Sequence, residues 1–380
     1  MYRLVFWQNC LSPHQMPYIS HLLDDERVNE VIIVIDELVT KDRKEMGWDV
    51  SSFSNLENYK IITSPSHSEI KNIFSIRQSD SIHFFSGING YSFIKKVLEI
   101  SLHFNIKRGI ITERPFTYKF GLANGKPLWM HKIRFHLHDK PYARHIQYVF
   151  AMGEDAVNYF EHVYRNWKVF PFIYCTDNKK HLITSITEHN SKPINIVFVG
   201  SLIRRKNPQI ILQALNKIST NKIHITFIGD GPEKKYMMKY MQKHNLNNID
   251  FKGFLSNNDI PDFLYKQDIL ILPSIHDGWG AVVNEGLTEG LFIICSDHVG
   301  AKDLLSENWR GEVFKNKDIH SLTKILKKCI KNIDTIRESK IKRMYWSRKY
   351  IAGDIISKYF IDCIDKGEAS KPWCEIIQQI

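Results

Sequence analysis

The sequence lacks several features that would place it in a class at once. Its longest apolar runs, Val31–Ile35 and Ile269–Leu272, are far shorter than the roughly 18 residues that a membrane span requires. The apolar stretch at the N-terminus is too brief for a signal peptide. The six cysteines form no C-x-x-C pair, which argues against a disulfide framework or a zinc site. We therefore expect a cytoplasmic protein with reduced thiols.

The chain carries a net charge of +11, concentrated in two stretches. Residues 315–350 hold twelve Lys or Arg against three acidic residues, and residues 101–150 hold nine against two. Such patches suit phosphates, anionic lipid head groups or nucleic acid. A solubilising helix surface explains the first patch equally well. No recognition-helix or RNP-like pattern accompanies the charge, so a nucleic-acid-binding protein has little support.

Short β-rich runs alternate with longer helical ones along the 380 residues. This pattern indicates mostly parallel sheets with helices on both faces. A polar stretch, Thr176–Lys192, interrupts the alternation, which then restarts. We predict an α/β protein of two doubly wound, Rossmann-like domains, at 1–175 and 193–345, facing a central cleft. The C-terminal segment, about 346–380, is expected to pack back on the first domain.

The pattern also predicts individual elements. Predicted strands are Leu4–Trp7, Val31–Ile35, Tyr59–Thr63, Ser81–Phe85, Arg108–Thr112, Val149–Met152, Lys168–Phe170, Ile194–Gly200, His224–Gly229, Asp250–Lys252, Ile269–Pro273 and Phe292–Ser296. Predicted helices include Tyr91–Phe104, Glu154–Tyr164, Pro208–Ile218, Glu233–His244 and Ala281–Glu289. Because ligands of such sheets bind beyond the carboxyl ends of the strands, the residues that follow each strand are the candidates for a site.

Charged residues and glycines follow two strands of the second half. The strand ending at Gly200 leads into three consecutive cations, Arg204–Lys206, ahead of a helix. Cations beside a helix N-terminus suit a diphosphate. The next strand ends in Gly229–Pro232, where Gly231 would let a ligand approach the backbone. An exposed charged turn and an ordinary strand-to-helix loop explain these two segments as well.

A third segment carries two carboxylates, Asp277 and Glu285, around the turn Gly278–Gly280. Carboxylates accept paired hydrogen bonds from sugar diols, so this spacing suits two neighbouring sets of hydroxyl groups. We expect Asp277 in the loop and Glu285 just over one turn inside the following helix. A favourable interaction with the helix dipole explains Asp277, but neither Glu285 nor the two glycines.

Together these segments resemble the nucleotide-sugar-binding domain of family-4 retaining glycosyltransferases of the GT-B fold. The similarity is strong over 194–305 and weak elsewhere. It rests on Gly200–Lys206 (G-R-L-x-x-x-K type), Gly229–Pro232 (G-D-G-P), Phe251–Gly253 (F-x-G), Asp277–Glu285 (E-x7-E) and Val299–Ala301. The chain contains no Asp-x-Asp, the signature of metal-using GT-A transferases, and no H-E-x-x-H. We therefore expect no metal and no cofactor.

The resemblance implies roles for single residues. Lys206 neutralises the donor diphosphate, Glu285 holds the ribose hydroxyls, and the backbone of Phe254 contacts the nucleobase. Asp277 replaces a glutamate that holds the donor sugar, and Ser201 replaces an arginine whose charge a neighbouring arginine then supplies. The remaining donor-binding candidates are Arg204, Arg205, Gly231, Gly278, Trp279 and Gly280. Lys206 and Asp277 are also candidates for catalysis.

The first half supplies candidates for the acceptor and phosphate side. The loop after the first strand resembles the N-x-x-S/H-P/H-H-Q loop of some capsule and surface-glycan transferases, which implicates His14 and Gln15. A helix N-cap at Ser12 explains this loop equally well. Glu113 and Arg114 stand where many relatives carry a histidine, and Glu113 is the third candidate for catalysis. The alternative is a Glu113–Arg114 ion pair without a direct role.

The stretch Lys126–Lys140 mixes apolar, basic and histidine residues. We expect a helix whose apolar residues face the core and whose outer face is basic. The alternative is a segment that lies on an anionic membrane surface. The resemblance implies a retaining, hexosyltransferase-like enzyme at the inner face of the cytoplasmic membrane. Its acceptor would be a lipid-linked intermediate of a bacterial surface polysaccharide, such as O-antigen, lipopolysaccharide or capsule. A GT-B nucleotide-sugar 2-epimerase is the alternative; an oxidoreductase is not, because no G-x-G-x-x-G follows the first strand.

Overall fold

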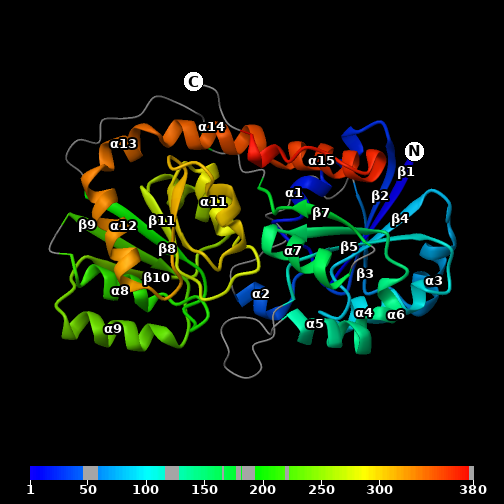
Figure 1. Cartoon of the computed structure of the whole chain (residues 1–380), viewed down its shortest axis with the longest axis horizontal. Coiled ribbons are helices and arrows are strands. Elements are labelled where there is room, and N and C mark those ends of the chain that lie inside the picture. The colour runs from blue at the N-terminus through cyan, green and yellow to red at the C-terminus, as the bar shows by residue number, and fades with distance from the viewer. Residues whose placement is uncertain are drawn as a thin grey trace. The chain divides into compact units, whose positions relative to one another are not determined.

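The computed structural model describes residues 1–45, 59–115, 128–164, 167–176, 181, 193–218 and 222–375. They form two compact units, each built on one parallel sheet (Figure 1). Unit 1 comprises 1–41, the described part of 50–175, and 352–372; unit 2 comprises the described part of 176–351 with 42–45 and 373–375. Of the predicted linker, all but 176 and 181 lies outside the described residues. The central cleft stays a prediction.

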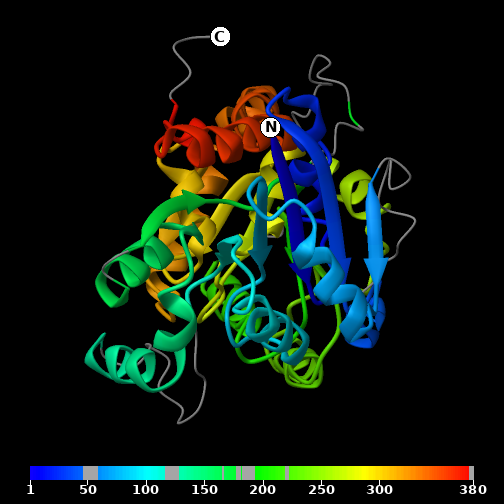
Figure 2. The same cartoon turned by 90° about the vertical axis from the view of Figure 1, so that its right-hand side faces the viewer.

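Seven parallel strands form the sheet of unit 1, in the order β3-β2-β1-β4-β5-β6-β7 (Figures 1 and 2). They are β1 (Tyr2–Gln8), β2 (Val28–Ile35), β3 (Lys60–Thr63), β4 (Ser81–Phe85), β5 (Lys107–Thr112), β6 (Tyr148–Met152) and β7 (Lys168–Phe172). All seven strands predicted for this half are present. The inner strands are almost wholly apolar because helices cover both faces of the sheet.

The helices of unit 1 follow the strands along the chain. They are α1 (Met16–Ile19), α3 (His67–Ser75), α4 (Ser92–Ser101), α5 (Leu128–Arg134), the π-helical turn Phe135–Asp139, α6 (Lys140–Ala143), α7 (Glu154–Val163) and α15 (Gly353–Lys366). Of α2 (Lys41–Glu45), the first residue is assigned to unit 1 and the rest to unit 2. Helix α3 was not predicted, although Ser66 and Glu69 form a complete capping box at its start. No helix in the described part of the chain is long and apolar enough to cross a bilayer.

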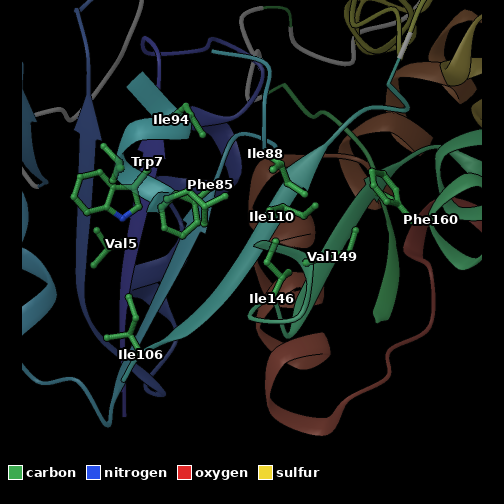
Figure 3. Close-up of a cluster of buried hydrophobic side chains, with 14 of the residues drawn as sticks. Val5, Trp7, Phe85, Ile88, Ile94, Ile106, Ile110, Ile146, Val149 and Phe160 are labelled. Atoms are coloured by element: carbon green, nitrogen blue, oxygen red, sulfur yellow. The ribbon is translucent and has the colours of Figure 1, made fainter. Parts of the chain in front are cut away.

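The core of unit 1 lies on both faces of its sheet. Figure 3 shows one cluster, in which strand residues such as Trp7, Phe85 and Val149 pack against helix residues such as Ile94 and Phe160. Phe360 of α15 belongs to a second, aromatic cluster, with its ring centroid 4.3 Å from that of Phe150 and 4.9 Å from that of Phe84. The C-terminal segment from 352 to 372 is therefore part of unit 1, whereas α14 (Lys340–Tyr350) is part of unit 2.

Six parallel strands form the sheet of unit 2, in the order β10-β9-β8-β11-β12-β13. They are β8 (Ile194–Val199), β9 (Ile223–Ile228), β10 (Ile249–Gly253), β11 (Ile269–Leu272), β12 (Phe292–Ser296) and β13 (Gly311–Phe314). The remaining helices are α8 (Gln209–Leu215), α9 (Glu233–Lys243), α10 (Ile260–Tyr265), α11 (Val282–Thr288), α12 (Ile319–Lys331) and α13 (Ile333–Glu338). The edge strand β13 was not predicted.

The strand order reverses once in each sheet, between β1 and β4 in unit 1 and between β8 and β11 in unit 2. In open parallel sheets, ligands bind beyond the carboxyl ends of the strands at such a reversal. Lys206 follows β8 and Asp277 follows β11, so these two candidates flank the reversal of unit 2. His14 follows β1 and therefore lies at the reversal of unit 1.

Candidate functional site

Side chains from the loops after β8 and β11 meet directly in unit 2. Lys206 Nζ donates to Asp277 Oδ2 over 2.5 Å. Arg205 Nη1 lies 3.6 Å from Asp277 Oδ1 and also donates to the backbone carbonyl of His276 at 3.0 Å. Ser274 completes the arrangement, because its hydroxyl donates to Asp277 Oδ2 at 3.1 Å. Residues from two segments that the sequence nominated separately, Arg205 with Lys206 and Asp277, thus form one charged cluster.

The cluster is largely shielded from solvent. Only 16% of the Lys206 side chain and 12% of the Asp277 side chain are exposed. Burial by itself would raise the pKa of Asp277, but the charge and hydrogen bond of Lys206, helped by Arg205, hold that pKa below its ordinary value. Asp277 is therefore ionised at neutral pH. Since the lysine ammonium has three donors, pairing with Asp277 leaves Lys206 capacity for a second anion.

Two glycines in the loop after β9 allow it to pack closely against the loop after β8. Gly229 and Gly231 have φ values of +119° and +155°, which disfavour residues with a side chain. A Cβ atom at Gly229 would lie 2.2 Å from the carbonyl oxygen of Gly200, and one at Gly231 would lie 2.5 Å from that of Leu202. The backbone of Gly231 is therefore closely approached by the loop after β8, which carries the cations.

The turn after Asp277 is fixed from two sides. The backbone N–H of Asp277 donates to the carbonyl of His298 at 3.0 Å, and the carbonyl of Asp277 accepts from Gly300 N–H at 3.2 Å. Trp279 is fully buried, and its indole N–H donates to Asn284 at 2.8 Å. The side chain of Trp279 therefore supports the turn from within the core. Sequence reasoning nominated neither His298 nor Asn284.

Glu285 lies in the first turn of α11, not past it as the sequence led us to expect, because the helix begins at Val282. Its side chain is partly buried, and burial raises its pKa to about 7. Glu285 therefore changes its charge close to neutral pH. Asp277 and Glu285 thus differ in protonation although they belong to one motif.

The other donor-binding candidates lie in loops of unit 2. Ser201 is half-buried and Arg204 is exposed, both in the loop after β8. Phe254 follows β10 with 44% of its surface exposed. Gly280 has a φ of +94°, so its place in the turn requires a glycine. Gly278 lies against Gly300. A Cβ atom added to Gly300 would lie 2.2 Å from the carbonyl oxygen of Gly278.

In unit 1 the loop after β1 leads through a turn into α1. The helix begins at Met16 with Gln15 in the N-cap position, so it starts later than the alternative with Ser12 as N-cap implied. Ser12 caps the preceding turn, because its hydroxyl accepts from His14 N–H at 3.3 Å and its carbonyl accepts from Met16 N–H at 3.0 Å. Gln15 is buried and accepts a 2.6 Å hydrogen bond from Gln8 Nε2. The ring of His14 lies 5.9 Å from that of Tyr174. Gln15 thus anchors the loop, and His14 lies beside the end of β7.

Tyr174 also connects to the end of β5. Its side chain is hydrogen-bonded to Glu113, and burial together with the negative charge of Glu113 raises the pKa of Tyr174 well above its ordinary value. The guanidinium of Arg114 lies 5.9 Å from the ring centroid of Tyr159. Glu113 and Arg114 therefore each contact an aromatic residue of unit 1. Tyr174 was not nominated because nothing in the sequence marks a contact between residues 113 and 174.

The described residues contain no metal centre beside the candidate residues of unit 1 and unit 2. Among them, no group of three or more His, Cys, Asp or Glu side chains is placed to hold a metal ion. The cations Lys206 and Arg205 are the positive charges beside Asp277. An anionic ligand in unit 2 would meet these side chains and the backbone of the glycine loops.

The chain has the GT-B fold, in agreement with the resemblance found in the sequence. The chain superposes on the structure of HepE from Anabaena in complex with UDP, with a TM-score of 0.68 and 13% identity, covering 96% of this chain and 100% of that one. Residues 180–345 match the model of the family described as glycosyl transferases group 1.

Two curated relatives come from bacteria. Protein CapJ of Staphylococcus aureus is 28% identical over 142 residues, which are 36% of this chain and 35% of CapJ. A Klebsiella pneumoniae protein named for the cps region is 22% identical over 173 residues, 45% of this chain and 46% of that protein. The chain thus spans less than half the length of the curated relatives that it matches.

Proposed function

We propose that the protein is a retaining glycosyltransferase that uses a nucleoside-diphosphate sugar. The observation that carries this proposal is the Lys206–Asp277 pair, flanked by Arg205, at the strand reversal of unit 2. It combines a cation for a diphosphate with a carboxylate for sugar hydroxyls, where ligands of such sheets bind. Glu285 adds a second carboxylate in the same motif. The match to group 1 glycosyl transferases, and the UDP bound to the Anabaena relative by fold, support a nucleotide donor.

In the proposed reaction, the bond between the anomeric carbon and the diphosphate oxygen breaks as the diphosphate leaves toward Lys206 and Arg205. These cations stabilise the developing negative charge. Asp277 holds hydroxyls of the transferred sugar, and Glu285 holds the ribose. The acceptor hydroxyl attacks from the face that the diphosphate leaves, so configuration is retained. The departing phosphate oxygen takes the acceptor proton, and no dedicated protein base is required.

The residues of unit 1 are proposed to serve the acceptor. Glu113 can accept a hydrogen bond from an acceptor hydroxyl and so polarise it, while Tyr174 fixes the carboxylate by donating to it. His14, which lies beside Tyr174, and Arg114 can contact sugar or phosphate oxygens. Gln15 contributes by holding the loop that carries His14.

We propose a glycan acceptor, in the form of a lipid-linked intermediate of a bacterial surface polysaccharide. The name of the Klebsiella relative, which refers to the cps region, and the basic stretches of the chain support this class. The enzyme would then act in the cytoplasm, at the inner face of the cytoplasmic membrane. We further propose that the reaction needs no metal, because the cations of unit 2 can balance the charge of the diphosphate.

A thermal-shift screen tests the donor assignment. UDP, GDP, ADP and their sugars are added over a range of concentrations. The correct nucleotide should raise the melting temperature progressively, because ligand binding stabilises the folded state by mass action. The same nucleotide sugar is then incubated with enzyme without an acceptor. Free epimerised sugar nucleotide would favour a 2-epimerase, and no stabilisation by any nucleotide would refute the proposal.

A further inference from the structure

We propose that one face of α5 and the following π-helical turn in unit 1 inserts into the head-group region of an anionic lipid bilayer. This inference rests on the proposed function, since a lipid-linked acceptor requires the enzyme to reach a membrane. It goes further by naming the surface and the lipid charge. Figures 1 and 2 place α5 at the periphery of unit 1.

Three large apolar side chains of this segment face outward at intervals of four residues. Trp129 is 61% exposed, Ile133 is 50% exposed and Leu137 is 69% exposed. We call these three residues the apolar stripe. Single exposed apolar residues are ordinary, but a contiguous row is typical of a surface that binds a membrane or another protein. The expectation that these apolar residues face the core is wrong for the three residues of the stripe.

The π-helical turn keeps the stripe straight. In an α-helix of 3.6 residues per turn, a residue four positions on lies slightly beyond one full turn, so a row with this spacing drifts around the helix. The turn Phe135–Asp139 is π-helical, with i→i+5 hydrogen bonds and a wider turn. A residue four positions on then falls short of a full turn. The drift between Trp129 and Ile133 is thus reversed between Ile133 and Leu137.

The opposite face of the segment is anchored to unit 1. Phe135 packs edge-to-face on Tyr164, with ring centroids 4.5 Å apart. Asp139 is buried, where it accepts hydrogen bonds of 2.6 Å from Asn89 and 2.8 Å from the Tyr164 hydroxyl. The segment is thus held by one face, and the stripe lies on a fixed helix surface.

The charges beside the stripe select the partner. Lys132 and Arg134 are half-exposed, and Lys140 and Arg144 are exposed. Asp139 is the one acidic residue between 128 and 146, and its side chain is buried. An apolar row bordered by cations matches the interface of an anionic membrane, where acyl chains lie beneath negative head groups. The complementary charge therefore favours a bilayer over a neutral or basic protein surface.

Vesicle binding by the full chain, without nucleotide, tests the assignment. The wild type is compared with Trp129→Ser/Ile133→Ser/Leu137→Ser on phosphatidylglycerol-containing and on pure phosphatidylcholine vesicles. We expect the wild type to prefer the anionic vesicles, and the triple variant to bind them at least about tenfold more weakly. The matched control is Leu38→Ser/Ile76→Ser, which removes two other exposed apolar residues of unit 1 and should bind as the wild type does.

Depth and salt provide independent readouts. Bilayer-embedded quencher lipids should quench part of the tryptophan fluorescence of the wild type but not of Trp129→Phe, which keeps the apolar face. Raising the salt concentration from about 0.1 M to about 1 M shortens the Debye length from about 10 Å to about 3 Å. Binding should weaken but persist, since the apolar contribution is not screened.

Three results would overturn the assignment: equal vesicle binding by the wild type and the triple variant, no binding of the wild type to either vesicle, or an oligomer that only the triple variant loses. The last result would show that the stripe binds a second copy of the chain. Nucleotide stabilisation of the triple variant should match the wild type. If nucleotide stabilises neither protein, the proposed function is refuted. If nucleotide stabilises both proteins and the triple variant binds vesicles as the wild type does, only the membrane role of the apolar stripe is refuted.

Discussion

Lys206 and Asp277 are 71 residues apart in the chain, yet the lysine ammonium donates to the carboxylate over 2.5 Å. The pair joins the loops after β8 and β11, the two strands between which the order of the sheet reverses. Because both side chains are largely shielded from solvent, each fixes the position of the other. A diphosphate that enters this site would find its cation already oriented, which reduces the cost of organising the site on binding.

The first prediction separates the two members of this pair. Asp277→Asn removes the negative charge but keeps the size of the side chain. Bare-nucleotide affinity should stay near that of the wild type, because the asparagine amide oxygen can still accept from Lys206 and hold the lysine in place for the diphosphate. Sugar transfer should fall by roughly ten- to a hundredfold, since a hydrogen bond to a charged group is worth about 1.5–3 kcal/mol. Calorimetry and a transfer assay measure the two effects.

Lys206→Ala is the matched comparison for Asp277→Asn. It should weaken the bare nucleotide and the nucleotide sugar alike, because its charge pairs with phosphate in both. If Asp277→Asn weakens the bare nucleotide as strongly as Lys206→Ala does, then Asp277 acts by positioning the lysine and does not hold the sugar.

The second prediction concerns the glycine loops of unit 2. Gly231→Ala places a Cβ atom 2.5 Å from the carbonyl oxygen of Leu202, at a φ of +155°. We expect a loss of about 1–3 kcal/mol in the free energy of unfolding, as for other overpacked sites, and weaker nucleotide binding. Gly90→Ala is the control, because nothing lies within 4 Å of the added atom. Denaturant unfolding that is equal for both variants would contradict the prediction.

Metal removal gives the third prediction. Activity should survive EDTA, because Lys206 and Arg205 supply the positive charge for the leaving diphosphate. The assay uses enzyme dialysed against the chelator and then supplemented with magnesium or manganese. Loss of activity that either ion restores would show that the charge of the diphosphate is balanced by a metal.

Much of the fold could be predicted because strands buried on both faces leave continuous apolar runs. Ser81–Phe85 and Phe292–Ser296 were predicted with the observed bounds. Strand β13 was missed because Gly311–Phe314 is short, lies at the sheet edge and has one half-buried and one exposed position between its buried ends. Helix α3 was missed despite the capping-box signal of Ser66 and Glu69.

The site was predictable as a set of loops but not as a set of contacts. Glycines and cations after a strand mark a loop, and this marked Lys206 and Asp277 separately. Their direct pairing depends on β8 and β11 being neighbours, which local sequence does not encode. The same holds for Tyr174 and Glu113, which follow different strands. Burial, not sequence, sets the protonation of Glu285.

The fourth prediction assigns Glu285 to the nucleotide. Glu285→Ala should weaken both the bare nucleotide and the nucleotide sugar by roughly ten- to a hundredfold, if its carboxylate holds the ribose. The Asp277→Asn variant should differ, because it keeps the wild-type affinity for the bare nucleotide. A Glu285→Ala protein that remains folded and binds nucleotide as the wild type does would remove Glu285 from the donor site.

The fifth prediction follows from the pKa of Glu285, which burial raises from 4.5 to about 7. Between these two values the folded protein binds more protons at this carboxyl than the unfolded chain does. The stability that the neutral carboxyl confers is therefore present below about pH 4.5 and is lost as the pH rises through about 7. Glu285→Gln stays neutral, so its stability relative to the wild type should increase by about 1–3 kcal/mol from pH 5 to pH 8. Denaturant unfolding at both values measures this difference.

The titration of Glu285 should also affect donor binding. In the wild type, affinity for the donor should rise with pH, whereas folding stability falls. Ribose hydroxyls donate to an ionised carboxylate more strongly than to a neutral carboxyl, so binding favours loss of the Glu285 proton. Affinity for the nucleotide sugar, whose diphosphate does not titrate in this range, should therefore rise from pH 6 to pH 8 in the wild type and stay flat in Glu285→Gln. Calorimetry in buffers of different ionisation enthalpy should detect the released proton near pH 6.5. If the two proteins share one pH profile, the carboxyl group that burial holds near neutrality does not contact the ribose, and its raised pKa reflects packing of α11 alone.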